Sequence, residues 1–284
     1  MMNKIIVPYV LRRGEDFMEE NTFSHAFVVC AYKESEYLEE CIISLVNQTR
    51  KSEVVICTST DCKYIRDIAD KYSVKLYIRD GENDIQKDWN FGCECSNAEW
   101  VTVAHQDDCY GKGYAEALYQ SVKDDEEALI FFTDYLPIKH GEISKDINCR
   151  IRRWLRMPMK VRTLSGKKWA KRMILAFGNS ICCPAVSYNR RKISGDIFTS
   201  KLKFGLDWDT FLKLSGLSGR FVYRDEVLTY YRIHKQATSM DFIENQKRET
   251  EDRYMFRQFW PEFIVNMIMP FYKKAYNTYC EEEK

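Results

Sequence analysis

The chain has 284 residues, of which 45% are hydrophobic and 30% charged, and its formal net charge is +1. This length suffices for one large folded domain or two small ones, and the composition is that of an ordinary globular protein. The near-neutral charge gives no overall attraction to polyanions, so we expect no nucleic-acid partner.

The first half alternates short apolar runs with amphipathic stretches. The apolar runs predict strands at residues 25–32, 53–60, 74–80, 99–105 and 128–135. The amphipathic stretches predict helices at residues 33–49, 61–72, 85–97 and 111–128. Asp61 is expected to cap the second of these helices. Helices between consecutive strands indicate right-handed crossovers, so the expected fold class is a doubly wound, mostly parallel α/β sheet with helices on both faces.

Polar residues follow several of the predicted strands, and ligands of such sheets bind at the carboxyl ends of the strands. The residues at these ends are Ala31, Thr58, Asp80 and the run HQDD at 105–108. Asp107 and Asp108 are adjacent carboxylates, which repel each other and resist burial. A cation, a helix N-terminus or exposure to water must offset that cost.

The second half has a different character. Between Cys149 and Ala176 the chain carries ten Lys and Arg residues and no acidic residue, with apolar residues interleaved. This pattern predicts a basic helical insert at 150–176, which is either a solvated face or, at 150–172, a surface for peripheral contact with anionic lipid. Downstream, the pattern predicts a strand within 178–190, a helix at 204–219, and one long strand or a strand pair at 220–234. An amphipathic helical segment from about 241 is expected to pack on the core, dimerise or touch a membrane.

The eleven cysteines are scattered, and none has the Cys-x-x-Cys spacing of a zinc site. We therefore expect reduced thiols and a cytoplasmic protein. No run of about 18 apolar residues is present, so no membrane span is expected. The N-terminal residues also lack the apolar segment of a signal peptide.

Three short motifs stand out downstream: DWNF at 88–91, LDWD at 206–209 and YRIH at 231–234. Each is weak alone, because an Asp-Trp-Asp is more often a helix surface and a lone histidine is more often a packed side chain. Three further motifs precede or separate them: AYKESEYLEECIISLVNQT at 31–49, CTSTD at 57–61 and HQDD at 105–108. In this order the set resembles glycosyltransferase family 2, inverting enzymes with a GT-A fold, over roughly residues 24–240.

The resemblance implies a nucleotide-sugar donor, with a UDP-sugar favoured, a saccharide or lipid-linked acceptor, and Mn²⁺ or Mg²⁺ as cofactor. It implies donor-binding roles for Ala31, Tyr32, Lys33, Glu34, Thr58, Ser59, Asp88, Asn90, His105, Gln106, Asp107 and Arg232. The implied metal ligands are Asp107, Asp108 and His234. The implied catalytic base is Asp207, with Asp209 as the second candidate. For Arg232, a fork to phosphate and a salt bridge to a nearby carboxylate are equally consistent with the sequence.

The chain departs from the family pattern at three places. Thr58 and Ser59 stand where relatives carry the acidic residue that recognises the base, so the nucleobase stays open. His105 replaces the first aspartate of the acidic signature. Leu206 replaces a glutamate beside the expected base.

The resemblance divides the chain into an extension at 1–22, a nucleotide-sugar-binding α/β half at 23–136, an acceptor-binding half at 137–240 and a C-terminal helical segment at 241–284. It implies a hexosyltransferase of bacterial surface polysaccharide biosynthesis, cytoplasmic or peripheral at the inner face of the membrane. The alternatives are a nucleotidyltransferase and a non-catalytic protein of the same fold that binds a nucleotide-sugar or glycan. The first needs a glycine-rich phosphate loop, and AYKESEY contains no glycine.

Overall fold

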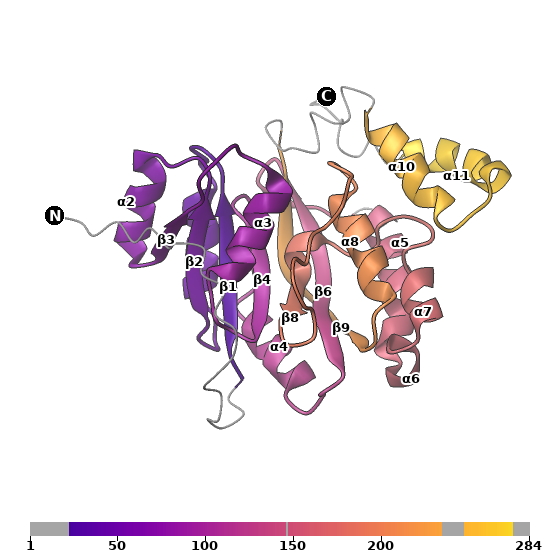
Figure 1. Cartoon of the computed structure of the whole chain (residues 1–284), viewed down its shortest axis with the longest axis horizontal. Helices are drawn as coiled ribbons and strands as arrows, with labels where there is room; N and C mark the ends of the chain where they lie inside the picture. Colours follow the sequence, from indigo (N-terminus) through magenta and orange to yellow (C-terminus); the bar gives the residue numbers. More distant parts are fainter. Residues whose placement is uncertain (1–22, 146, 235–246, 275–284) are drawn as a thin grey trace.

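The computed structural model describes residues 23–145, 147–234 and 247–274, so the extension expected at 1–22 lies outside the described residues. One sheet runs through the middle of the molecule, with helices packed on both of its faces (Figure 1). This arrangement confirms the predicted fold class. The amphipathic helix expected from about residue 241 is described from Lys247 onward as two helices.

The sheet has nine strands in the order β3-β2-β1-β4-β8-β6-β9-β5, with β7 paired to β6. The strands are β1 (His25–Ala31), β2 (Glu53–Thr58), β3 (Lys75–Ile78), β4 (Trp100–His105), β5 (Cys109–Tyr110), β6 (Ala128–Lys139), β7 (Glu142–Ile143), β8 (Val186–Asn189) and β9 (Arg220–Ile233). Strands β1 to β4 pair in parallel, as do β6 and β9. The short strand β8 is antiparallel to both of its neighbours and lies between β4 and β6. Residues 220–233 form one long strand rather than a pair.

The helices divide between the two faces because the side chains of each strand alternate between them. The helical segments are α1 (Leu38–Val46), α2 (Lys63–Tyr72), α3 (Ile85–Glu94), α4 (Tyr114–Val122), α5 (Ile147–Arg156), η1 (Met157–Lys160), α6 (Arg162–Ser165), α7 (Lys168–Met173), η2 (Cys183–Ala185), α8 (Leu206–Ser215), α10 (Lys247–Arg257) and α11 (Glu262–Lys274). Phe27 and Val29 of β1 pack with α1, α2 and α4. Val28 of the same strand belongs to the other core, which includes α7, α8, α10 and α11.

The start of α2 differs from the expectation. Asp61 does not cap this helix: Cys62 occupies the cap position, and no side chain bonds the free N–H groups there. Asp61 instead forms a two-pronged ion pair with Arg66 on the first turn of the helix. The charged guanidinium is a better partner for this carboxylate than a single backbone N–H.

Part of the basic insert pairs with acidic side chains of the sheet instead of only facing solvent. Arg156 is 1% exposed and donates to the carboxylate of Asp134 at 2.6 Å. Arg153 and Lys160 both pair with Asp225, the latter at 2.8 Å. The insert therefore uses much of its charge to neutralise acidic side chains of β6 and β9.

Two expectations about the chain as a whole can be compared with the described residues. Their ten cysteines are all free thiols. Across the same ranges, every helix is too short or too polar to cross a bilayer.

The Asp134–Arg156 pair provides a test of the fold. Asp134→Ala leaves a buried guanidinium without its main countercharge, so we expect it to lower the free energy of unfolding by about 3–5 kcal/mol. Urea unfolding followed by circular dichroism measures this change. The control is Glu226→Ala, which breaks an exposed pair with Arg224 and should cost less than about 1 kcal/mol. Equal losses in the two variants would show that the buried pair does not stabilise the fold.

Candidate active site

A cavity of about 590 Å³ opens where β1 and β4 end, a size typical of small-molecule sites. Its wall combines the ends of β1, β4 and β9 with the starts of α3 and α8, and residues of α5, α10 and α11 complete it. Parallel strands end at the same edge of a sheet, which explains why polar residues far apart in the sequence meet here.

The acidic edge of the cavity is formed by His105, Asp107 and Asp108 at the end of β4. One potential ligand atom from each of the three residues lies within 4.8 Å of the others. The side chain of Asp108 is only 4% exposed and that of Asp107 is 23% exposed. Simple exposure to water therefore does not offset the repulsion between the two carboxylates.

The end of β9 supplies much of the compensation. The backbone N–H of Arg232 donates to the carboxylate of Asp108 at 2.8 Å, and its guanidinium donates to the carbonyl of Asp107 at 3.0 Å. The same guanidinium pairs with Glu40 at 2.6 Å, so Arg232 forms a salt bridge to a nearby carboxylate. The imidazole of His234 lies 3.0 Å from the carboxylate of Asp107.

These surroundings move the two carboxyl groups in opposite directions. Burial strongly raises the pKa of Asp108, and the charge of Asp107 raises it further. Burial also opposes ionisation of Asp107, but the hydrogen bond with His234 and the charges of His105 and His234 bring its pKa below the usual range. Asp107 is thus held as a carboxylate, whereas Asp108 favours its protonated form in the absence of a nearby cation.

The residues at this edge fit a divalent cation. Carboxylate oxygens are the ligands that Mg²⁺ and Mn²⁺ prefer, and imidazole is acceptable to Mn²⁺. The Nε2 atom of His105 is buried and has no hydrogen-bond partner among the described residues. Burial lowers the pKa of His105, which favours the neutral form that can bind a metal.

His105, which replaces the first aspartate of the acidic signature, packs against a side chain of α3. The ring of His105 stacks on Trp89, with ring centroids 4.9 Å apart and an interplanar angle of 21°. Both side chains line the cavity. The histidine that departs from the family pattern is therefore held against a neighbouring aromatic ring.

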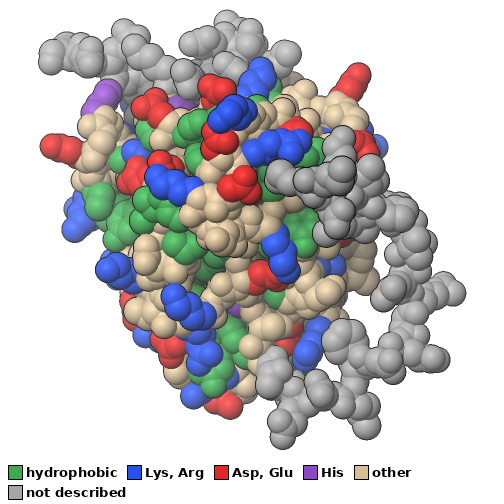
Figure 2. Space-filling view, turned by 90° about the vertical axis from the view of Figure 1, so that its left-hand side faces the viewer, with side chains coloured by type: hydrophobic (Ala, Val, Ile, Leu, Met, Phe, Trp, Pro, Cys, Tyr) green, Lys and Arg blue, Asp and Glu red, His purple; other side chains and the backbone are tan. Residues whose placement is uncertain are grey.

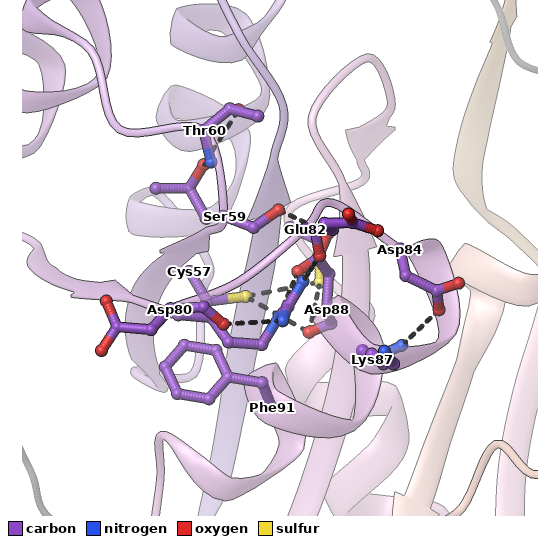
Figure 3. A network of polar contacts seen from close by, with 12 residues as sticks. Cys57, Ser59, Thr60, Asp80, Glu82, Asp84, Lys87, Asp88 and Phe91 are labelled. Atoms are coloured by element: carbon purple, nitrogen blue, oxygen red, sulfur yellow. Dashed lines mark hydrogen bonds and ion pairs between the residues drawn. The ribbon is translucent and has the colours of Figure 1, made fainter.

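The donor-side residue Asp88 is fixed by the neighbouring strands. Its carboxylate accepts from the guanidinium of Arg79 at 2.7 Å and from the hydroxyl of Ser59 at 2.9 Å. Figure 3 shows the hydroxyl of Ser59 turned toward this carboxylate. The carbonyl of Asp80 accepts from the guanidinium of Arg79 at 3.0 Å. Asp88 lines the cavity, and the contacts with Arg79 and Ser59 hold its carboxylate in one orientation.

The other predicted donor residues divide into two groups. Ala31, Tyr32 and Gln106 line the cavity, and the side-chain amide of Gln106 bonds both the N–H and the carbonyl of Tyr32. The residues that do not line it are Lys33, Glu34, Thr58, Ser59 and Asn90. The amide of Asn90 bonds the main chain of Phe198 on both sides, which is a structural role.

Asp207 lies in the first turn of α8 and lines the same cavity as the acidic edge. Its carboxylate accepts from the amide of Asn179 and from the N–H of Trp208, each at 2.7 Å. Burial raises the pKa of Asp207 to about 6 despite these bonds and the nearby charge of Arg152. The second candidate, Asp209, does not line the cavity and pairs with Lys213 at 2.7 Å.

Sequence reasoning missed the residue that holds the start of α8. The carboxylate of Glu251 on α10 accepts from three successive N–H groups, those of Lys203, Phe204 and Gly205, at 3.0, 2.8 and 2.8 Å. This contact fixes the loop that leads into Asp207. No local pattern indicates it, because the partners are more than 45 residues apart.

Comparisons with known proteins agree with this geometry. The sequence model of glycosyl transferase family 2 matches residues 26–198. Among solved structures, S. aureus TarS 1–349 in complex with UDP-GlcNAc superposes with a TM-score of 0.56 at 17% identity, covering 84% of this chain and 71% of that one. Mannosyltransferase PcManGT from Pyrobaculum calidifontis, in complex with GDP-Man and Mn²⁺, gives 0.54 at 14% identity, covering 83% and 65%. Among curated proteins, the search finds no significant match.

The carboxyl group of Asp207 provides a direct test of the site. Carbon-detected NMR should give a pKa of about 6 for Asp207. Asn179→Ala removes a donor to the charged form, so the pKa should rise further. Asn47→Ala is the control, since that amide bonds only the carbonyl of Ile43 and should leave Asp207 unchanged. An Asp207 that titrates in the ordinary range near 4 would contradict the buried environment described here.

Proposed function

The chain belongs to glycosyl transferase family 2, and we propose that it is a metal-dependent, inverting hexosyltransferase acting on a nucleotide-sugar. The observation that carries the proposal is the pairing, across one cavity, of an acidic edge with a carboxyl group whose pKa is about 6. The first suits a diphosphate held through a cation, and the second suits a general base near neutral pH.

Inversion requires a single displacement at the anomeric carbon. Asp207 takes the proton of the acceptor hydroxyl, whose oxygen forms the new bond to the sugar while the bond to the diphosphate breaks. The nucleoside diphosphate leaves on the opposite side, so no covalent enzyme intermediate is needed. Asn179 orients the carboxylate for this transfer, and Glu251 fixes the loop before it.

Mn²⁺ or Mg²⁺ would neutralise the charge that develops on the leaving diphosphate. Asp107 is the main proposed ligand, with Asp108 and His234 as further ligands and His105 available beside them. His234 and Asp107 contact each other, which supports a role for His234 beside the proposed metal and diphosphate. Arg232 contacts both aspartates and lines the cavity, which supports a role for it beside the proposed diphosphate site.

The proposed donor is a nucleotide-sugar, with a UDP-sugar favoured because TarS is known in complex with UDP-GlcNAc. Because PcManGT is known in complex with GDP-Man, GDP-sugars are the alternative donors to be tested. The proposed acceptor is a saccharide or a lipid-linked hydroxyl. By analogy with the family, we place the reaction in bacterial surface polysaccharide biosynthesis, on the cytoplasmic side of the membrane.

Replacement of the proposed base should separate chemistry from binding. Asp207→Asn should lower transfer by about 10²–10⁴-fold, because a carboxamide cannot accept the proton. Donor affinity should change little, since Asp207 is not among the residues proposed to hold the metal and diphosphate. Asp209→Asn is the matched variant two residues further along the same helix, and it should retain most of the activity.

The assay is turnover of UDP-, GDP- and dTDP-sugars with a panel of acceptors, and it also identifies the donor. In the wild type, kcat/KM should fall as the pH drops below about 6, because protonation removes the base. Loss of activity in Asp209→Asn with retention in Asp207→Asn would reverse the assignment. Nucleotide binding without turnover of any donor would favour the non-catalytic alternative.

Replacement of the proposed metal ligand should act on binding. Asp107→Ala should weaken Mn²⁺-dependent UDP binding at least about tenfold, as measured by calorimetry, because it removes the best-ionised carboxylate of the edge. Asp61→Ala is the control, since Asp61 pairs with Arg66 on the surface. Unchanged affinity in Asp107→Ala, or equal affinity with and without chelator, would contradict the metal site.

A further inference from the structure

Helix α5 exposes its apolar side chains to solvent, whereas a helix packed on a folded domain normally buries them. Ile147, Ile151 and Trp154 are spaced to form one stripe along the helix, and they are 61%, 50% and 74% exposed. The buried residue of α5 is Arg156. Amphipathic helices normally bury the apolar stripe, so the inverted orientation of α5 indicates a contact outside the chain.

Helix α11 repeats the pattern. Phe263, Met267 and Phe271 lie four residues apart on one face and are 67%, 67% and 73% exposed. Val265 and Met269 on the opposite face pack into the core, so α11 is anchored by one apolar face and presents a second one to solvent. Lys273 and Lys274 follow at the end of the helix.

A third set of exposed apolar side chains lies on and just after α7. Trp169 and Met173 lie one turn apart on α7, and Phe177 follows that helix; all three are exposed. Phe177 contacts Trp260 in the connection before α11, with ring centroids 5.2 Å apart. Figure 1 places α5, α7 and α11 at the same end of the molecule, away from α2 and β3. Figure 2, which faces the α2 end, shows Lys/Arg and Asp/Glu side chains intermingled.

The charge around these sets selects the partner. Residues 149–176 contain no acidic residue, and within the described ranges Arg150, Lys167 and Lys168 form no ion pair. A second copy of the chain would bring two basic surfaces together across a symmetric contact. Exposed Trp and Phe side chains beside unpaired Lys and Arg are the composition of interfacial helices on anionic lipid.

We propose that the exposed stripes of α5, α7 and α11 form a docking surface for an anionic lipid bilayer. This inference rests on the proposed function for its role: Arg152 of α5 and Tyr272 of α11 line the cavity that contains Asp207. A bilayer seated on these helices would border the acceptor side of the cavity. Of the two proposed acceptor classes, this favours the lipid-linked one.

The test is flotation of the full-length protein with vesicles of phosphatidylcholine, alone or mixed with phosphatidylglycerol. The wild type should bind the anionic vesicles at least about tenfold more tightly, and the binding should weaken at high salt. Trp154→Ser/Phe271→Ser removes the two most exposed aromatic anchors and should lower binding about tenfold or more. Lys167→Gln/Lys168→Gln should lower binding to the anionic vesicles only.

The matched control is Ile43→Ser/Ile78→Ser, which replaces two exposed apolar side chains of α1 and β3, outside the three helices. It should bind vesicles like the wild type. Absence of wild-type binding, or equal losses in the control and the Trp154/Phe271 variant, would overturn the proposal. A dimer that dissociates in the Trp154/Phe271 variant, with no vesicle binding by the wild type, would also overturn it by assigning the surface to a second copy. Vesicle binding is measured without donor or acceptor, so a failure of the proposed transfer reaction leaves this result standing.

Discussion

Two adjacent carboxylates at the end of β4 set the main physical constraint on this molecule. Asp108 is nearly buried beside Asp107, and such a pair persists only where other groups offset its charge. The end of β9 provides those groups through the N–H of Arg232 and the ring of His234, over 120 residues further along the chain. The long parallel pairing of β9 with β6 is what brings them there. The sheet therefore determines both the position and the protonation of the acidic edge.

The part of the cavity that contains Asp207 depends on a different long-range contact. Asp207 lies in the first turn of α8, and the loop before this helix is held by three N–H bonds to Glu251 of α10. α10 lies beyond residues 26–198, the part that matches the family. Leu206 stands where the family pattern has a glutamate, yet a glutamate from the C-terminal helices stabilises the same helix start. The part of the cavity that contains Asp207 is thus stabilised by a segment beyond the residues that match the family.

The repeating patterns of the sequence were sufficient for the longer strands, the main helices and the fold class, because burial on a sheet face or helix face leaves a period that can be counted. The two-residue strands β5 and β7 were not predicted, because they are too short to show a period. The patterns were also insufficient where a side chain had a choice of partners. Asp61 satisfies Arg66 rather than the start of α2, and Arg156 turns inward to Asp134 although its neighbours suggested a solvated face. The insertion of β8 between β4 and β6 likewise left no local signal, since pairing order is decided by tertiary packing. For the candidate site, motif order placed Asp107, Asp207 and His234 in one cavity, whereas Asn179 and Glu251 carry no motif at all.

The basic insert shows how the same residue types can serve two purposes. Arg156 pairs with Asp134 and Arg153 pairs with Asp225. These ion pairs fix the orientation of α5 about its own axis. Once Arg156 faces the core, the stripe of Ile147, Ile151 and Trp154 must face out, because it lies on the other side of the helix. Exposure of the stripe is therefore a consequence of a buried ion pair and not of loose packing. The ion pairs therefore keep this apolar surface exposed and in a fixed position, as the proposed contact with a bilayer requires. Arg152 of the same helix lines the cavity that contains Asp207.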